Sequence, residues 1–204
     1  MILIHTSDLH LKNPQSEELD RIVKETIKRD AKALLIAGDL FDSNNPSKET
    51  ISYVKKKFKK LKDKKIFVFV IMGDSEEKAL RFKSLGRNVK IFRSKKIKIK
   101  KIKGLKVYGA SYSKGNPLKK FISNNTSYSI GMLHVRLEDL KVEEINNSNL
   151  DYLALGHYHD LTKVKSKIPC YYSGSPVKKL KYKISQRYIM QIDLDKKKIK
   201  KIKI

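Results

Sequence analysis

The sequence predicts an α/β fold in which two sheets pack face to face and helices lie on the outside. Short apolar runs alternate with amphipathic helical patterns in the first half of the chain, and the second half contains mainly strand-like runs. Hydrophobic residues make up 40% of the 204 residues, which is enough for one core. There is no internal repeat and no linker-like stretch, so one domain over residues 1–204 is the simplest interpretation.

The first half of the chain is expected to alternate strands with helices. Ser16 is a predicted helix cap, because acidic residues follow it and apolar residues then recur at helical spacing. The Asn45-Pro46 pair is predicted to open a second amphipathic helix. The apolar stripes of the two helices are Leu19, Ile22, Val23 and Ile27, then Ile51, Val54, Phe58 and Leu61. The predicted strands of this half are 2–5, 33–37, 66–72 and 89–92, with a short helix over about 76–84.

The second half is expected to consist mainly of strands. Lys and Ile alternate over 96–100, and Gly104 separates this run from the next one, which favours a hairpin with one solvent-facing side. The single cysteine, Cys170, lies in an apolar run and is expected in the core. The predicted strands are 96–100, 105–110, 129–135, 151–156, 170–172 and a closing hairpin of 187–194 and 199–204.

The composition restricts the environment and the partners of the chain. Lys and Arg number 47 against 21 Asp and Glu, so the formal net charge is +26. Such a field attracts polyanions, nucleic acid above all, although a lysine-rich proteome or a thermophile would also explain it. One cysteine cannot form an internal disulfide, and no apolar run approaches the roughly 20 residues of a membrane span. We therefore expect a cytoplasmic protein without a membrane partner.

Polar residues with metal-ligand chemistry follow the predicted strands. Because strand ends converge at one edge of a sheet, we expect these side chains to meet there. They are Asp8, His10, Asp39, Asp74, His134, His157 and His159. A mixed set of histidines and carboxylates suits Mn, Fe or Zn better than Mg or Ca. The set exceeds the four ligands of one tetrahedral site, so two ions about 3.5–4 Å apart are predicted, which favours phosphoryl chemistry.

The order of these motifs resembles the calcineurin-like metallophosphoesterases. The matching motifs are Asp8-Leu9-His10, Gly38-Asp39-Leu40-Phe41-Asp42, Gly131-Met132-Leu133-His134 and Gly156-His157-Tyr158-His159. The opening ILIHTSDLHL and the later Ser173-Gly174-Ser175-Pro176 are most similar to the DNA-repair exonucleases of the SbcD/Mre-eleven type, over about residues 1–180. The resemblance implies a four-layer α/β/β/α sandwich and a manganese-dependent phosphodiesterase that acts on DNA ends.

The resemblance also implies roles for the individual residues. One metal ion would be held by Asp8, His10, Asp39 and His159. Asp39 would bridge to a second ion, which would also be held by Asp74, His134 and His157. The expected cofactors are therefore two divalent ions, Mn foremost, with Fe or Zn as alternatives.

The third motif departs from the family, which has Gly-Asn-His-Asp or Gly-Asn-His-Glu where this chain has Gly73-Asp74-Ser75-Glu76. Asp74 adds a negative charge, which should tighten metal binding and make the metal pair a poorer electrophile. Ser75 replaces a histidine that, in the family, stabilises charge or protonates the leaving group, commonly worth roughly 10²–10⁴-fold. His5 is another candidate for that role, but its place inside the first predicted strand favours a structural one.

A second departure is the length of the chain. Family nucleases carry a capping domain and a segment that docks on an SMC-like coiled-coil ATPase, and neither is evident here. We therefore expect a catalytic core without a cap. We make no prediction about the oligomeric state. The preferred hypothesis is a metal-dependent nuclease or phosphodiesterase in which Asp39, Asp74 and Ser75 take the catalytic positions. The alternative is a weak or inactive relative that binds nucleic acid or a repair partner through its lysines.

Overall fold

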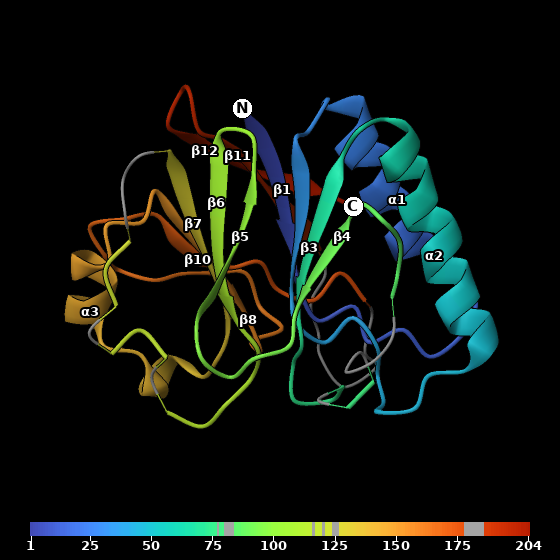
Figure 1. Cartoon of the computed structure of the whole chain (residues 1–204), viewed down its shortest axis with the longest axis horizontal. Helices are drawn as coiled ribbons and strands as arrows, with labels where there is room; N and C mark the ends of the chain where they lie inside the picture. The colour runs from blue at the N-terminus through green and yellow to red at the C-terminus, as the bar shows by residue number, and fades with distance from the viewer. Residues whose placement is uncertain (77, 80–83, 116, 120, 124–126, 178–185) are drawn as a thin grey trace.

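Two six-stranded mixed sheets face each other in the computed structural model of the chain (Figure 1). The structure describes residues 1–76, 78–79, 84–115, 117–119, 121–123, 127–177 and 186–204. The first sheet has the order β12-β11-β1-β2-β3-β4, and the second has the order β5-β6-β7-β8-β10-β9. The first sheet contains β1 (Ile2–Thr6), β2 (Ala33–Ala37), β3 (Phe67–Ile71), β4 (Val89–Phe92), β11 (Tyr188–Asp193) and β12 (Lys198–Lys203). The second contains β5 (Lys98–Ile102), β6 (Leu105–Ala110), β7 (Tyr128–His134), β8 (Tyr152–Gly156), β9 (Thr162–Lys163) and β10 (Cys170–Tyr172).

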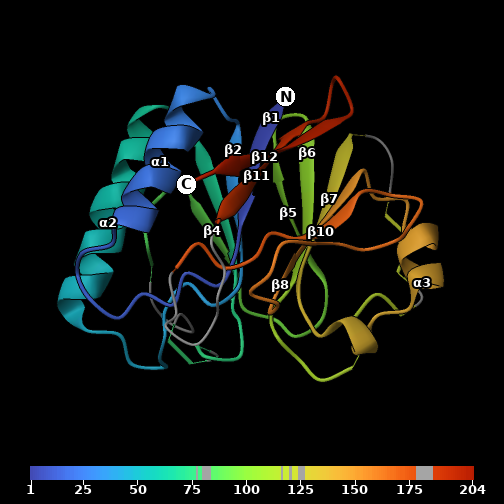
Figure 2. The ribbon, with the colours of Figure 1, turned by 180° about the vertical axis from the view of Figure 1, so that it is seen from behind.

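Helices cover the two outer faces, which completes the predicted four-layer sandwich (Figures 1 and 2). Helices α1 (Glu17–Lys28) and α2 (Lys48–Asp63) lie on the first sheet. Helix α3 (Val142–Asn147) and the 3₁₀ helix η1 (Leu137–Asp139) lie on the side of the second sheet. The α/β/β/α prediction is therefore confirmed.

The side chains of strand β2 alternate between two hydrophobic cores, one under the helices and one between the sheets. Its residues Leu34 and Ile36 pack toward α1 and α2, whereas Ala33, Leu35 and Ala37 pack between the two sheets. A strand that is covered on both faces has no polar side, so an uninterrupted apolar run is the expected sequence. A third hydrophobic cluster, which includes Ile145 of α3, covers the outer face of the second sheet.

The predicted helix caps are partly confirmed. The side chain of Ser16 accepts a hydrogen bond from the backbone N–H of Leu19, as expected for the start of α1. The predicted start of the second helix at Asn45-Pro46 is wrong, because α2 begins after Ser47. The Ser47 side chain accepts a hydrogen bond from the Thr50 N–H, and this cap satisfies a backbone donor that has no partner within the helix.

The predicted strands lie within two residues of their observed bounds, and β2, β4, β6 and β10 match residue for residue. The exposed hairpin strand β5 begins at Lys98 rather than at residue 96. The sequence did not predict α3, η1 or β9, which are too short to show a periodic pattern. Of the helix predicted over 76–84, the described residues Glu76, Lys78 and Ala79 form turns, and 77 and 80–83 lie outside the described residues.

Cys170 is buried, as predicted. Within the described ranges, no helix has the length and apolar character required to cross a membrane.

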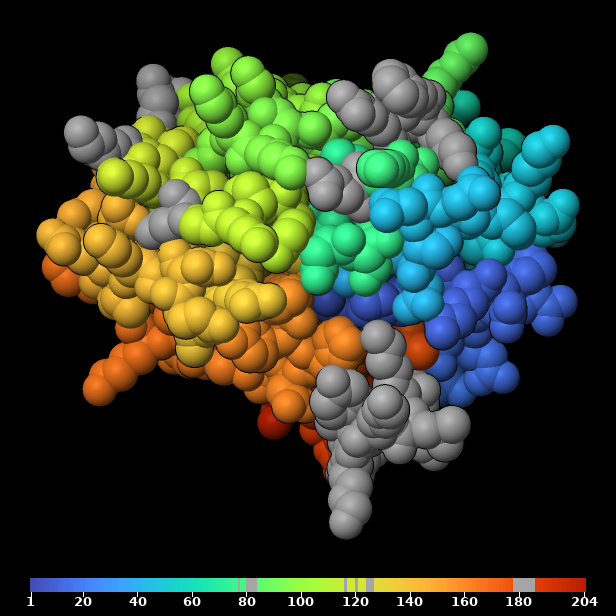
Figure 3. Space-filling model, turned by 90° about the horizontal axis from the view of Figure 1, so that it is seen from below, coloured from blue at the N-terminus to red at the C-terminus, as the bar shows by residue number. Residues whose placement is uncertain are grey.

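The parallel strands direct their carboxyl ends to one edge of the molecule, at the bottom of Figure 1. Figure 3 shows this edge from below, where segments from the beginning (blue), the middle (green) and the later part (orange) of the chain meet. The predicted polar strand ends are all brought to this edge, because β1, β2 and β3 are parallel neighbours and so are β7 and β8.

Candidate metal centre

The loops after β1 and β2 run side by side and hold the first site residues. The backbone N–H of Asp8 donates to the carbonyl of Gly38 (3.0 Å), and that of His10 donates to the carbonyl of Asp39 (2.9 Å). These bonds continue the pairing of the two strands beyond their ends. They place Asp8, His10 and Asp39 on adjacent loops although the two loops lie far apart in sequence.

Four residues of the site have positive φ: Asp8 (53°), His10 (46°), Asp39 (49°) and His157 (106°). They are half of the eight non-glycine residues with positive φ in the described chain. Residues with a Cβ rarely adopt this region, and such a conformation typically costs about 1–3 kcal/mol. The surrounding fold therefore holds the backbone of these four residues in a conformation that an isolated loop would avoid.

Asp8, His10 and His159 form a first cluster, in which one ligand atom of each residue lies within 4.8 Å of the others. The Nε2 atoms of His10 and His159 are 3.3 Å apart, and His159 Nε2 is 3.9 Å from Asp8 Oδ1. Asp8 is fully buried, and its Oδ1 has no hydrogen-bond partner among the described residues. A buried carboxylate oxygen without a partner is energetically unfavourable, so this cluster fits a cation.

Asp74, His134 and His157 form a second cluster with the same 4.8 Å limit. Asp74 Oδ1 is 2.9 Å from His134 Nε2 and 3.4 Å from His157 Nδ1. His134 Nδ1 donates to the carbonyl of Ala37 (2.8 Å), which fixes the ring and directs Nε2 into the site. Such a backbone acceptor behind a histidine is typical of metal ligands.

Asp39 lies between the two clusters. Its Oδ2 is 3.5 Å from His10 Nε2 and 3.9 Å from His134 Nε2. Asp8, Asp39 and His134 also satisfy the 4.8 Å limit, so this third group joins one member of each cluster to Asp39. The structure thus brings the seven predicted ligands together, with Asp39 in the place expected of a bridging carboxylate; their metal-binding roles stay a prediction.

The ionisable groups of the site shift one another's pKa values. Burial raises the pKa of Asp39 and, although His134 opposes this, the neighbouring carboxylate of Asp8 raises it further. Hydrogen bonds from His134 and His157 hold the pKa of Asp74 far below its usual range. Burial disfavours the charged form of His134, but the hydrogen bond with Asp74 and the charges of Asp8 and Asp39 outweigh burial and raise its pKa to about 9. In this field of carboxylates, positive charge is stabilised at the site.

Ser75 contacts Asp39 twice. Its backbone N–H donates to Asp39 Oδ1 (3.0 Å), and its hydroxyl donates to Asp39 Oδ2 (2.9 Å). Gly73 also packs on this carboxylate, because a Cβ at position 73 would lie 2.0 Å from Asp39 Oδ1. Ser75 and Gly73 therefore hold the carboxylate that lies between the two clusters.

Sequence reasoning missed the role of Glu76. This side chain is fully buried and accepts hydrogen bonds from the backbone N–H groups of Leu40 (3.0 Å) and Phe41 (2.8 Å). Burial raises the pKa of Glu76 to about 8. Glu76 thus supports the loop that carries Asp39, and the signal in the sequence was an acidic residue inside the third motif.

Tyr112 was also missed, and no sequence pattern marks it. Its ring is nearly parallel to that of His157 (17°, centroids 6.2 Å apart) and packs edge-on against His134 (6.0 Å). His5, in contrast, lies away from the site. It is fully buried in β1, its Nδ1 is hydrogen-bonded to the Tyr152 hydroxyl (2.9 Å), and burial lowers its pKa to about 3. This surrounding agrees with the structural role predicted for His5.

The calcineurin-like phosphoesterase family model matches residues 1–161, and the chain belongs to this family. Proteins of the family use a pair of divalent metal ions, and the two clusters are candidates to hold such a pair. Membership supports a phosphoesterase activity and confirms the resemblance that the motifs predicted.

Two curated relatives are similar in sequence. The metallophosphoesterase YhaO of Bacillus subtilis is 27% identical over 198 residues, covering 78% of this chain and 48% of YhaO. The DNA double-strand break repair protein Mre11 of Sulfolobus acidocaldarius is 32% identical over 156 residues, covering 66% of this chain and 41% of Mre11. The aligned region therefore covers less than half the length of each of these two relatives.

Solved structures confirm the fold. An archaeal phosphodiesterase superposes with a TM-score of 0.60 at 16% identity and covers 100% of both chains. The protein TT1561 of Thermus thermophilus superposes with a TM-score of 0.62 at 12% identity and covers 99% of this chain and 98% of its own. At these identities the likeness describes the arrangement of the two sheets and their helices.

Proposed function

We propose that the chain is a metal-dependent phosphodiesterase that acts on DNA through two divalent ions, Mn²⁺ foremost. The observation that carries the proposal is the position of Asp39 Oδ2 between His10 (3.5 Å) and His134 (3.9 Å), which links the two clusters into one site. Two ions that share a carboxylate suit the displacement of one phosphate oxygen by another.

The residues present fit such a pair of ions. The buried Oδ1 of Asp8 has no hydrogen-bond partner among the described residues, and burial raises the pKa of Asp39, so both carboxylates are stabilised by added positive charge. One ion would be held by Asp8, His10, Asp39 and His159, and the other by Asp39, Asp74, His134 and His157. When bound, the ions would polarise the phosphate and offset the negative charge that develops during the reaction.

The contribution of the chain itself is orientation. The Ala37 carbonyl holds the His134 ring, and the Ser75 N–H and hydroxyl hold the Asp39 carboxylate. The net charge of +26 attracts a polyanionic substrate, and the similarity to Mre11 favours DNA among the polyanions. A coiled-coil ATPase partner and a cytoplasmic location remain predictions from the sequence.

Protonation of the leaving group is the weak step of this proposal. The chain has five histidines, of which four lie in the two clusters and His5 lies within β1, hydrogen-bonded to Tyr152. No histidine is left for the role of the family's acid histidine. We therefore expect esters with good leaving groups, such as bis(p-nitrophenyl) phosphate, to be hydrolysed faster than DNA.

The test is Mn²⁺-dependent hydrolysis of bis(p-nitrophenyl) phosphate and of DNA by the purified chain. Asp39→Ala and His134→Ala should each lower the rate by at least about 10³-fold, because each removes a predicted ligand. The matched control is His5→Gln, a buried histidine outside the site, which should retain activity within about threefold. Hydrolysis that survives in both Asp39→Ala and His134→Ala would contradict the proposal.

Ser75 favours a second candidate function, a relative that binds DNA or a repair partner with weak turnover. Its hydroxyl is hydrogen-bonded to Asp39, and serine lacks the acidity of a protonated histidine. This candidate predicts binding of metal and DNA by the unaltered chain with little hydrolysis of either substrate. A robust rate of DNA cleavage would exclude it.

A further inference from the structure

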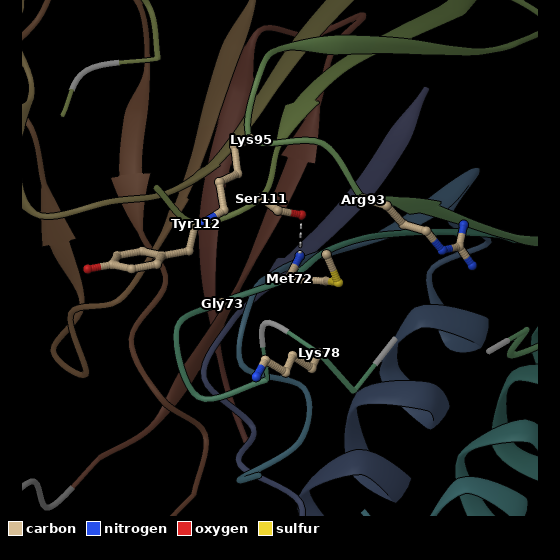
Figure 4. A pocket seen from close by; sticks show the side chains of 7 residues that line it. All are labelled: Met72, Gly73, Lys78, Arg93, Lys95, Ser111 and Tyr112. Carbon is tan, nitrogen blue, oxygen red and sulfur yellow. Dashed lines mark hydrogen bonds between the residues drawn. The ribbon is translucent and has the colours of Figure 1, made fainter. Parts of the chain in front are cut away.

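A basic pocket adjoins the candidate metal centre, and Figure 4 shows the residues that line it. It is lined by Met72, Gly73, Lys78, Arg93, Lys95 and Tyr112, together with the Ser111 hydroxyl. Its volume is about 190 Å³. This is smaller than the roughly 300–1,000 Å³ of a site that encloses a whole small molecule, so the pocket suits one group of a larger ligand.

The pocket shares its wall with the metal centre. Gly73 lines the pocket and also packs so closely on Asp39 that a Cβ would lie 2.0 Å from Oδ1. Tyr112 lines it too, and its ring is nearly parallel to that of the predicted ligand His157. Only the wall formed by Gly73 and Tyr112 therefore separates a group held in the pocket from the predicted metal ligands Asp39 and His157.

Hydrogen bonds fix this wall. The Met72 N–H donates to the Ser111 hydroxyl (3.0 Å), and the Tyr112 N–H donates to the Met72 carbonyl (2.8 Å). Met72 follows β3 and Tyr112 follows β6, so the bonds join one sheet to the other at the site edge. The position of the pocket relative to the metal centre is thus set by the backbone.

The charge of the pocket is opposite to that of the metal centre. Three cationic residues line it, and none of its described lining residues is acidic. In Figure 4, Lys95 and Lys78 lie on opposite sides of the Met72–Gly73 segment, and Arg93 extends away to the right. Two lysine side chains on either side of a small volume match the charge and the oxygen acceptors of a phosphate group, and Arg93 adds positive charge farther out.

We propose that this pocket holds a phosphate of the DNA strand next to the phosphate that is cleaved. The proposal rests on the proposed function, because it takes the metal centre as the place of cleavage. Successive phosphates of one strand are the anions that such a substrate presents side by side. A single strand is the expected ligand, since it can bend around the wall formed by Gly73 and Tyr112.

A second basic surface provides a comparison. Lys55, Lys59 and Lys62 of α2 line another cavity with Arg87. This cavity includes no residue of the two clusters, and α2 lies on the outer face of the first sheet (Figure 1). It has similar charge without a wall in common with the metal centre, which makes it the appropriate control.

The experiment measures binding of a fluorescent single-stranded DNA oligonucleotide to the metal-free chain in EDTA, by anisotropy at several salt concentrations. Lys78→Ala with Lys95→Ala should weaken binding by at least about fivefold, and should reduce the slope of log K against log salt by about 0.7, the value for one phosphate. Lys59→Ala with Lys62→Ala removes the same charge from the remote surface and should weaken binding by less than about twofold. Both lysines of the first pair are exposed, so the variants should fold, which circular dichroism checks.

Equal effects of the two pairs, a larger effect of the α2 pair, or no binding by the unaltered chain would each overturn the proposal. Failure of the proposed function is recorded separately, as absence of Mn²⁺-dependent hydrolysis of bis(p-nitrophenyl) phosphate. The binding assay contains no metal and no turnover, so the two failures are distinguishable.

Discussion

Two buried histidines, His5 and His134, show how differently the interior and the edge of this molecule treat the same side chain. His5 is 0% exposed and His134 is 2% exposed. Burial lowers the pKa of His5 to about 3, whereas at His134 the hydrogen bond with Asp74 and the neighbouring carboxylates outweigh burial and raise the pKa to about 9. Burial by itself therefore does not determine the charge of a histidine in this fold.

The difference follows from the position along the strand. His5 lies within β1, where its hydrogen-bonded neighbour is the neutral hydroxyl of Tyr152. His134 is the last residue of β7, at the edge where the loops after the other parallel strands deliver Asp39 and Asp74. The residues before His5 in β1, Leu3 and Ile4, are buried and apolar, whereas the acidic residues Asp39 and Asp74 stand in the loops that follow β2 and β3. The contrast places the ionised side chains at the edge and a neutral histidine in the interior, and four changes test it.

The largest expected effect on stability comes from the loop that supports the edge. Glu76→Ala leaves the buried N–H groups of Leu40 and Phe41 without their acceptors and should lower the free energy of unfolding by about 3 kcal/mol. Urea unfolding of the metal-free chain at neutral pH measures this. Glu143→Ala, at an exposed position in α3, is the control and should change stability by less than about 0.5 kcal/mol. Similar values for the two variants would show that Glu76 does not support the loop.

The interior histidine should make stability depend on pH. Its folded pKa of about 3 lies below the unfolded value of 6.5, so the unfolded chain takes up the proton first as the pH falls. This contribution is present above pH 6.5 and is lost progressively toward pH 3, by about 2 kcal/mol between pH 7 and pH 5. His5→Gln removes the titration, so the difference in unfolding free energy between the variant and the unaltered chain should change by that amount over the same interval. A difference that is constant with pH would contradict the assignment of His5 to the interior.

Substitution of Ser75 tests whether the site lacks a proton donor for the leaving group. Ser75→His should raise the rate of DNA hydrolysis by at least about tenfold, because it supplies the proton donor that the family has at this position. Hydrolysis of bis(p-nitrophenyl) phosphate, whose leaving group needs no proton, should change less. Ser75→Ala serves as the control, since it removes the hydroxyl contact with Asp39 without adding an acid. An equal gain with both substrates would show that the substitution acts by changing the orientation of the Asp39 carboxylate and not by supplying an acid.

The smallest of the four expected effects is that of Asp74→Asn on the pKa of His134. Asp74→Asn removes the charge beside His134 and should lower the pKa of His134 by about one pH unit in the metal-free chain, as measured by NMR titration. The pKa of His5 should not move, because its surroundings do not include Asp74. If the pKa of His134 stays near 9 in this variant, the buried carboxylates Asp8 and Asp39 carry the effect instead.

The apolar patterns predicted the two sheets well for identifiable reasons. β2 is covered on both faces, so all five residues of its run ALLIA are apolar and buried, and the predicted ligands Asp39 and His134 could be recognised as polar residues at strand ends. The start of α2 was mispredicted because Asn45-Pro46 and Ser47 both carry helix-start signals, and only the observed contact of Ser47 with the Thr50 N–H distinguishes them. The partners of Ser75 and Glu76 could not be predicted, because each lies 35 or 36 residues away along the chain.

The sequence by itself determined the residue types of the predicted ligands, their order and their place after strands, because hydrophobic periodicity and motif spacing are local properties. Only the tertiary structure decided that Asp39 lies between the two clusters, that Ser75 holds Asp39, and that a basic pocket adjoins them across Gly73. These facts depend on strand order and on loop crossings that join distant segments, as where the His157 N–H meets Asp8 Oδ2 at 3.2 Å across 149 positions. Such contacts have no local signature, since they exist only after the two sheets have packed.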